Sequence, residues 1–212
     1  MKYKFPYWGP FVIETQMDSE LVMLLLAKGE EATLDARRDL AGQLNKEFYY
    51  ENFEEWFVPK FTQYVDLYIE GLMTQQPTAF SYFYGKDTWL FPRGEHDEVG
   101  WTLEKLWINY QQANEYNPPH YHTGDLSFVV YLQVPQELIK EHEEKQHEHN
   151  NEGPGAICLQ YGEQLFFSVS RYWTMPTEGM LIIFPAWVQH YVHSFTSDVE
   201  RISVSGNIKL IP

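Results

Sequence analysis

Hydrophobic positions in the first hundred residues recur at helical spacing. A residue that favours helix starts, Asp18, leads into the apolar stretch ELVMLLLAKG, which predicts a short helix that ends at Gly29. Farther along, large apolar side chains recur in steps of three and four, which predicts an amphipathic helix over residues 54–74. Pro59 falls in its first turn, where proline is tolerated. Residues 1–17 mix aromatic residues, proline and glycine, and predict an extended arm or an edge strand.

The pattern changes near residue 105 to short runs rich in Val, Ile, Phe and Tyr, separated by glycine, proline or charged residues. Runs of this composition and length are typical of strands. The predicted strands are 105–111, 126–134, 156–161, 164–171, 179–184, 188–195 and 201–210. Together they predict a mainly β, α+β protein in which helices brace one face of a sandwich or barrel.

The length of 212 residues fits a single domain of ordinary size. Within it, we expect residues 1–100 to form an arm and a helical support, and residues 101–212 to form the β core. A polar insertion, residues 136–155, interrupts that core.

The insertion carries His142, His147 and His149, which admits two interpretations. The histidines could form a second metal site, or the segment could be a solvated, mobile excursion between two strands. The second interpretation is favoured because nothing apolar in the segment is expected to fix the histidines in place. Its position beside the predicted β core is also compatible with a lid.

Composition narrows the classes of partner. The hydrophobic content of 44% is that of a globular protein, and the formal net charge of -15 disfavours nucleic acid, because no run of Lys and Arg offsets the repulsion of phosphates. The longest apolar run near the start is too short to cross a bilayer, and the lone Cys158 can form no internal disulfide. We therefore expect a soluble, cytoplasmic protein without a membrane partner.

The stretch HYHTGDLSFVVYL concentrates metal-binding side chains before a predicted buried strand. On a strand, residues two apart share a face, so His120 and His122 can point into one pocket, and Asp125 could bend toward the same point. A further ligand is available from EGMLIIFPAWVQH, where His190 begins the next predicted strand. His193, three residues on, is expected to face the other side and to play a structural or supporting part.

A buried cation is predicted on the last strand. Arg201, Ser203 and Ser205 alternate with apolar residues in RISVSGN, so they project from one face. An arginine that points into a barrel needs a protein carboxylate or an anionic ligand, since an unpaired buried charge costs several kcal/mol. Guanidinium groups match carboxylates well, and a neighbouring serine adds a donor.

These residues resemble those of the iron(II)- and 2-oxoglutarate-dependent dioxygenases, whose fold is a double-stranded β-helix, also called a jelly roll. The run from Trp107-Ile-Asn109 through the His-x-His motif, LSFVVYLQVP, EGMLIIFPAWVQH and RISVSGN is similar to a branch of that superfamily found in bacteria and in phages that infect cyanobacteria. The resemblance covers roughly residues 105–208. For a phage-encoded member, it implies the host cytoplasm as the location.

The resemblance implies roles for individual residues. His120 and His190 would bind iron(II), and Arg201, helped by Ser203, would hold the distal carboxylate of the cosubstrate 2-oxoglutarate (2OG). Most of the superfamily has an acidic residue where this chain has His122, so either His122 completes a three-histidine site or Asp125 supplies the third ligand. We favour His122. The implied reaction uses dioxygen to hydroxylate a substrate C–H bond.

Two other functions fit parts of the same pattern. A cupin, which is a related metal-binding barrel, would use the His-x-His motif with Asp125 and would leave Arg201 without a role. A barrel that has lost its chemistry would serve as an interaction module. The resemblance does not identify the substrate: a prolyl or other peptide side chain and a small metabolite are both open. The aromatic-rich helix or arm could support a homodimer.

Overall fold

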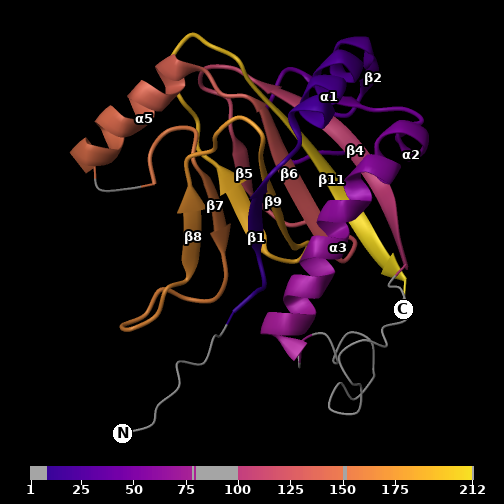
Figure 1. The fold of residues 1–212 in the computed structure, drawn as a ribbon. Coiled ribbons are helices and arrows are strands. Elements are labelled where there is room, and N and C mark those ends of the chain that lie inside the picture. Colours follow the sequence, from indigo (N-terminus) through magenta and orange to yellow (C-terminus); the bar gives the residue numbers. More distant parts are fainter. Residues whose placement is uncertain (1–8, 78, 80–99, 150–151, 212) are drawn as a thin grey trace, which may run out of the picture.

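The computed structural model describes residues 9–77, 79, 100–149 and 152–211, which form two facing antiparallel sheets and a set of helices (Figure 1). The large sheet has the order β1-β9-β6-β11-β4-β3-β2, and the small sheet has the order β5-β10-β7-β8. The strands of the large sheet are β1 (Ile13–Gln16), β2 (Leu34–Asp35), β3 (Glu47–Tyr49), β4 (Gly100–Gln111), β6 (Leu126–Gln133), β9 (Met180–Pro185) and β11 (Arg201–Ile211). Those of the small sheet are β5 (Asn117–His120), β7 (Ile157–Gln160), β8 (Arg171–Thr174) and β10 (Gln189–Val192).

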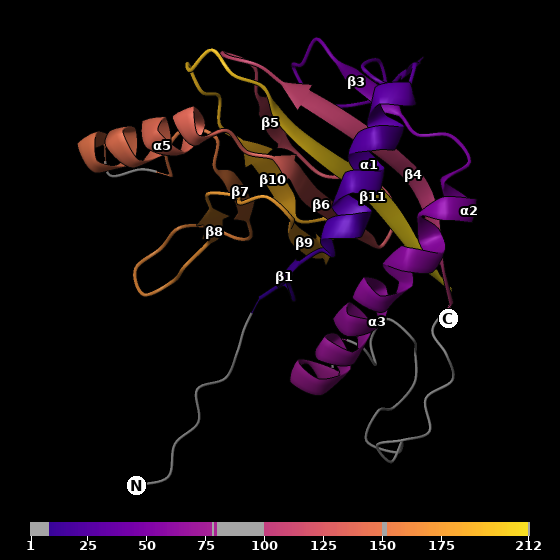
Figure 2. The same ribbon diagram turned by 45° about the horizontal axis from the view of Figure 1, so that its top comes forward.

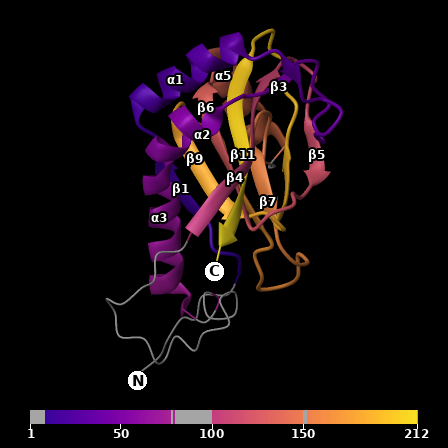
Figure 3. The ribbon, with the colours of Figure 1, turned by 90° about the vertical axis from the view of Figure 1, so that its right-hand side faces the viewer.

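Four helices complete the described fold, namely α1 (Ser19–Glu31), α2 (Phe53–Trp56), α3 (Val58–Gln75) and α5 (Gln136–His149). The helices α1 and α3 lie across one face of the large sheet, and the small sheet lies on its other face (Figure 3). Helix α5 lies apart from them, beside the small sheet (Figure 2). This is the jelly-roll arrangement braced by helices that the sequence predicted.

Strand β6 shows why the large sheet has a core on each side. Its side chains alternate: Phe128 and Val130 are buried against α1 and α3, whereas Val129 and Tyr131 are buried between the two sheets. Because both faces are covered, the strand reads as a continuous apolar run rather than as an alternating one. The second core, between the sheets, surrounds the candidate site.

The N-terminal elements largely match the pattern that predicted them. The edge strand expected within residues 1–17 is β1, while residues 1–8 lie outside the described part of the chain. Helix α1 continues two residues beyond its predicted end at Gly29. The single helix predicted over 54–74 is instead two helices that meet at Phe57, with Pro59 in the first turn of the second.

The largest error among the predicted strands is the segment 164–171. It forms the connection between β7 and β8 rather than a strand, and its tip places Phe166 and Phe167 fully in solvent. Aromatic residues there mimicked a strand although they pack against nothing in the described structure. The other six predicted strands are present with ends that differ by a few residues, β4 starting five residues earlier.

The polar insertion also differs from its favoured interpretation. It is not an irregular excursion, because residues 136–149 form helix α5. Leu138 and His142 are buried on one face of this helix, and the Nδ1 atom of His142 lies 2.9 Å from the carbonyl oxygen of Pro154. Because most residues of the helix are polar, its sequence did not reveal the narrow face, with Leu138 and His142, that packs against the rest of the protein. The side chains of His147 and His149 lie outside the described part of the structure.

Membrane insertion through a helix finds no support in the described residues, where none of the helices combines the length and the apolar character that a bilayer span requires.

Candidate active site

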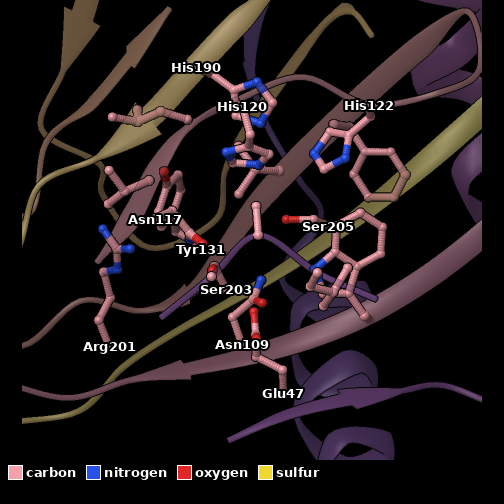
Figure 4. A pocket seen from close by; sticks show the side chains of 18 of the residues that line it. Glu47, Asn109, Asn117, His120, His122, Tyr131, His190, Arg201, Ser203 and Ser205 are labelled. Atoms are coloured by element: carbon pink, nitrogen blue, oxygen red, sulfur yellow. The ribbon is translucent and has the colours of Figure 1, made fainter. Parts of the chain in front are cut away.

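Three histidines from separate segments converge between the two sheets. His120 at the end of β5 lies directly opposite His190 of β10 in the antiparallel ladder. His122 follows β5, and its backbone N–H donates to the carbonyl oxygen of Ala186 at 2.9 Å, which ties this turn to the segment before β10. One ring nitrogen from each histidine lies within 4.8 Å of the others, and Figure 4 shows the three rings grouped together. The spacing suits a single metal ion bound by three imidazoles.

Backbone carbonyl groups orient two of these rings. The Nδ1 atom of His120 lies 2.7 Å from the carbonyl oxygen of Pro118, and that of His190 lies 3.0 Å from the carbonyl oxygen of Val188. A carbonyl can only accept, so each Nδ1 carries the proton and donates it. The Nε2 lone pair of each ring is therefore free for a metal, as in most histidine-ligated sites.

The electrostatic environment keeps all three rings neutral. Burial lowers the pKa of His120, and burial together with the neighbouring His120 lowers the pKa of His122 to about 4. The pKa of His190 is well below its ordinary value because this ring is buried and faces the other two. Only a neutral imidazole offers a lone pair, so the cluster can bind a cation near neutral pH without first losing protons.

Asp125, the alternative metal ligand, and His193 both lie away from the cluster. The carboxylate of Asp125 accepts from the Lys209 ammonium at 3.0 Å and from the backbone N–H of Leu210 at 2.8 Å, so the structure does not bring it to the histidine cluster. The Nε2 atom of His193 lies 3.6 Å from a carboxylate oxygen of Glu152, away from the cluster. This position fits the structural or supporting role expected for His193.

Arg201 is a buried cation without a carboxylate partner among the described residues. Its side chain is 2% exposed. One guanidinium nitrogen donates to the carbonyl oxygen of Gly155 at 2.8 Å, another donates to the side-chain oxygen of Gln111, and the group lies over the Tyr131 ring, 5.2 Å from its centroid. Burial lowers the pKa of Arg201, yet guanidinium groups stay protonated in proteins. All three partners are neutral, so the positive charge is not compensated.

Arg201 and the histidines line the same cavity, which has a volume of about 50 Å³. Ser203 and Ser205, which share a strand face with Arg201, line it as predicted. Three buried polar atoms of its lining have no hydrogen-bond partner among the described residues, namely the Nε of Arg201, the hydroxyl of Tyr131 and the Oε2 of Glu47. Burial raises the pKa of Tyr131 to about 12, so the hydroxyl keeps its proton and can donate it. Buried donors without protein partners are rare, and donors that line a cavity favour a bound molecule that accepts hydrogen bonds.

Aromatic residues form part of the cavity wall. Trp107 and Tyr131 line the cavity, and the ring of Trp107 packs edge-on against His122 with centroids 5.5 Å apart. Tyr110 points to the helix side of the sheet, among the residues packed on the first core. Trp187 is 55% exposed and is not among the residues that line the cavity.

Several polar residues in or next to the cavity were missed in the sequence. Asn109, which lines the cavity, and Gln111, which accepts from Arg201, are buried on β4, where they share a face with Trp107 and alternate with apolar residues. This alternation in WINYQ was a signal that could have identified them. Glu47 on β3 gave no such signal, because its strand has only three residues and its position depends on pairing with Asn109 of β4.

The sequence matches a model of the family described as "Putative 2OG-Fe(II) oxygenase" over residues 105–207, which run from β4 to β11 and contain the histidine cluster and Arg201. No curated protein matches the sequence. The match favours the oxygenase over the two alternatives raised by the sequence, the cupin and the barrel without chemistry.

Solved structures with similar folds include three such enzymes. The viral collagen prolyl hydroxylase of Paramecium bursaria Chlorella virus-1, solved with 2OG, is 12% identical and has a TM-score of 0.55, with 94% of this chain and 96% of that chain covered. A Pseudomonas putida prolyl-4-hydroxylase is 12% identical with a TM-score of 0.52, covering 93% and 91%. An oxidoreductase of the 2OG-Fe(II) oxygenase family from Burkholderia pseudomallei is 10% identical with a TM-score of 0.54, covering 93% and 84%.

At such identities the likeness establishes the fold and leaves the substrate open. Residues 105–207 therefore match the family of putative 2OG-Fe(II) oxygenases, and the chain has a jelly-roll fold similar to that of solved enzymes of this kind.

Proposed function

We propose that this protein is an iron(II)- and 2OG-dependent hydroxylase in which His120, His122 and His190 bind the metal, and Arg201 with Ser203 binds the distal carboxylate of 2OG. The observation that carries the proposal is the presence of two complementary binding groups in one cavity. Three neutral imidazoles converge with ring nitrogens within 4.8 Å of one another, and the buried Arg201 guanidinium has only neutral partners among the described residues. A metal chelated by a keto-diacid would complete both.

The donor set fits iron(II). Imidazole nitrogens are suitable ligands for ferrous iron, and three protein ligands leave three coordination positions for other molecules. Bound iron(II) and 2OG would together supply the activation of dioxygen that inserts an oxygen atom into a substrate C–H bond. The carbonyl groups of Pro118 and Val188 hold two of the ligand rings in place, which lowers the entropy lost on metal binding.

Residues at the other end of the cavity fit a carboxylate. The free Nε of Arg201 and the hydroxyls of Tyr131 and Ser203 are donors that could reach one anionic group. Charge-assisted hydrogen bonds to a guanidinium are about twice as strong as neutral ones, and burial removes competing water. Arg201 therefore serves as the main anchor, and the two hydroxyls fix the orientation of the carboxylate.

His122 is the better candidate for the third metal ligand. Its ring faces both other histidines, with centroid separations of 4.9 Å to His120 and 5.0 Å to His190. Asp125 already satisfies both of its carboxylate oxygens with Lys209 and the backbone of Leu210. Moving this carboxylate to the metal would break those contacts, whereas His122 needs no such rearrangement.

The proposed reaction is hydroxylation, and two classes of substrate fit it. Two proteins of similar fold are prolyl hydroxylases. A prolyl or other peptide side chain and a small metabolite are both compatible with the cavity described so far. The walls formed by Trp107, Tyr131 and Phe184 would exclude water from the reacting groups in either case.

The proposal is tested by anaerobic titration of the iron(II)-loaded protein with 2OG, followed by the weak visible charge-transfer band of the chelate. We expect a saturable band in the native protein. Arg201→Ala should raise the dissociation constant of 2OG by about ten- to a hundredfold, because one charge-assisted contact contributes roughly 1.5–3 kcal/mol. The metal affinity should not change.

Two variants make this test specific. Arg201→Lys keeps a positive charge in case the alanine variant does not fold, and it should bind 2OG with intermediate affinity because lysine cannot form the same fork of hydrogen bonds. Arg37→Ala removes an exposed arginine that pairs with Asp35, and it should bind 2OG normally. A native protein without a band, or an Arg201→Ala variant with native affinity for 2OG, would refute the proposal.

A further inference from the structure

Glu47 is a buried carboxyl group that lines the proposed active site and that the proposed reaction does not use. It lies on β3, its side chain is 1% exposed, and its Oε2 atom has no hydrogen-bond partner in the described part of the chain. Its Oε1 atom faces the backbone of Gly42, where an added Cβ would lie only 2.5 Å from that oxygen. The carboxyl group is therefore enclosed, and one of its oxygens is free to accept.

The side chains around Glu47 do not neutralise it. Asn109 is its cross-strand partner, and Asn117 lies against the same glycine; both are uncharged amides. Among the residues that line the cavity, Arg201 is the sole Lys or Arg, and its guanidinium is bound to Gln111 and Gly155. No contact within the described part of the chain therefore supplies the positive charge that a buried carboxylate needs.

Charged groups farther from Glu47 also disfavour its ionised form. Burial and, to a smaller extent, the nearby carboxylates of Glu115 and Asp35 raise the pKa of Glu47 to about 7. Arg37 opposes this effect, but its guanidinium forms an exposed pair with Asp35. A cation bound at Oε2 would reverse the shift and stabilise the ionised form.

The position of Glu47 separates it from the predicted cosubstrate anchor. Glu47 on β3 pairs with Asn109 on β4, and Asn109 pairs with Ser203 on β11, the strand that also carries Arg201. Glu47 therefore lies two strands away from the strand of Arg201. Tyr131 on β6 lies one strand farther still. Figure 4 shows Glu47 on the far side of Asn109 from Ser203, with the histidines at the opposite end of the view. Because 2OG is itself a dianion, a carboxylate at Glu47 would repel it, and this part of the cavity is left to the other reactant.

We propose that Glu47 is a specificity-determining residue that binds a cationic nitrogen group of the substrate, an ammonium or a guanidinium. This inference rests on the proposed function, because it assigns the substrate of the same site. A carboxylate is a pure acceptor and forms its strongest hydrogen bonds with charged donors. The formal net charge of -15 would also draw a cationic substrate toward the protein.

Calorimetric titration with matched pairs of probes tests this recognition. L-Lysine is compared with L-norleucine, and L-arginine with L-citrulline, so that each pair differs mainly in one positive charge. The probes are added to the full chain, first metal-free and then loaded anaerobically with iron(II) and 2OG. We expect at least one cationic probe to bind at least tenfold more tightly than its neutral partner. In Glu47→Gln that preference should fall to less than twofold.

Other variants and readouts exclude simpler explanations. Glu47→Asp keeps the charge and should retain most of the preference, which guards against a folding defect in the glutamine variant. Asp39→Asn removes the same charge from an exposed position on the preceding loop and should leave the preference unchanged. Binding of 2OG to Glu47→Gln should not be weaker than to the native protein.

The outcomes distinguish this inference from the proposed function. If 2OG binds normally but the native protein does not prefer either cationic probe, or if Glu47→Gln keeps the preference, the role of Glu47 is refuted while the cosubstrate site stands. If the metal-free protein prefers cations through Glu47 but the loaded protein never forms the 2OG chelate, the proposed function fails while the cation site remains.

Discussion

At the scale of single residues, the decisive feature is a buried arginine whose partners are all neutral. A carboxylate at the position of Gln111 would complete an internal ion pair with Arg201, but the chain has an amide there. Leaving a guanidinium in a buried site without an anion costs several kcal/mol in the unliganded protein. Under the proposed function, this cost is recovered when the anionic cosubstrate binds.

This reasoning predicts the effect of adding the missing charge. Gln111→Glu should give Arg201 an internal partner, so that the dissociation constant of 2OG rises at least tenfold while metal binding is unchanged. Calorimetric titration with 2OG measures the effect, and urea unfolding should show that the unliganded variant is no less stable than the native protein. Gln112→Glu, which adds the same charge on an exposed neighbour, is the matched control. Equal 2OG affinity in the native protein and Gln111→Glu would contradict the assignment of Arg201.

The residues of the site differ in how far sequence could reveal them. His120, His122, His190, Arg201 and Ser203 stand in short motifs at the ends of predicted strands, and all five line the cavity. Their candidate roles follow from the spacing of these motifs and from the family that the motifs resemble. The roles proposed for Gln111 and Glu47 depend on partners on other strands, so they cannot be inferred before the sheet order is known.

At the scale of elements, helix α5 is joined to the segment before β11 by one carboxylate. Glu141 accepts the backbone N–H groups of Thr196 and Ser197 at 2.9 and 2.7 Å, both hydroxyls, and the Lys145 ammonium at 2.7 Å. Burial would raise the pKa of Glu141, but these hydrogen bonds outweigh it and hold the pKa at about 2. The carboxylate therefore stabilises the fold only while it is ionised.

The pH dependence of stability follows from the sign of that shift. Because the folded pKa is below the unfolded value of 4.5, the contribution is fully present above pH 4.5 and is lost as pH falls toward 2. Its size is about 2–3 kcal/mol. Urea unfolding at pH 6 should therefore show Glu141→Gln to be less stable than the native protein, with most of the difference gone at pH 3. The exposed Glu144→Gln should differ little at either pH, and a pH-independent loss in Glu141→Gln would contradict this account.

The sequence predicted an element well where its apolar residues followed a single clear pattern. It predicted an element poorly where only a few residues are buried or where apolar residues are exposed. Strand β6 is buried on both faces and reads as an unbroken apolar run. Helix α5 has a mostly polar sequence, and the burial of Leu138 and His142 appears only when the small sheet is in place. The loop before β8 has the composition of a strand, yet Phe166 and Phe167 are exposed, because composition does not reveal whether a partner strand exists.

At the scale of the whole molecule, the two sheets bring together ligands that lie seventy residues apart in the sequence. The small sheet pairs His120 with His190, and the large sheet presents Arg201, Ser203 and Tyr131 to the same cavity. Helices α1 and α3 cover the opposite face of the large sheet (Figure 3). The facing sheets therefore hold the three candidate metal ligands in place, which would reduce the entropy cost of the proposed metal binding.

The most direct test of the central claim is the metal affinity of single variants of the candidate ligands. Competition with a chromophoric chelator, with iron(II) under anaerobic conditions, should show one metal ion per native chain. His122→Ala should weaken binding by at least tenfold, as expected for loss of a ligand, whereas Asp125→Asn should bind as the native protein does. Native affinity in His122→Ala together with a large loss in Asp125→Asn would contradict the three-histidine site.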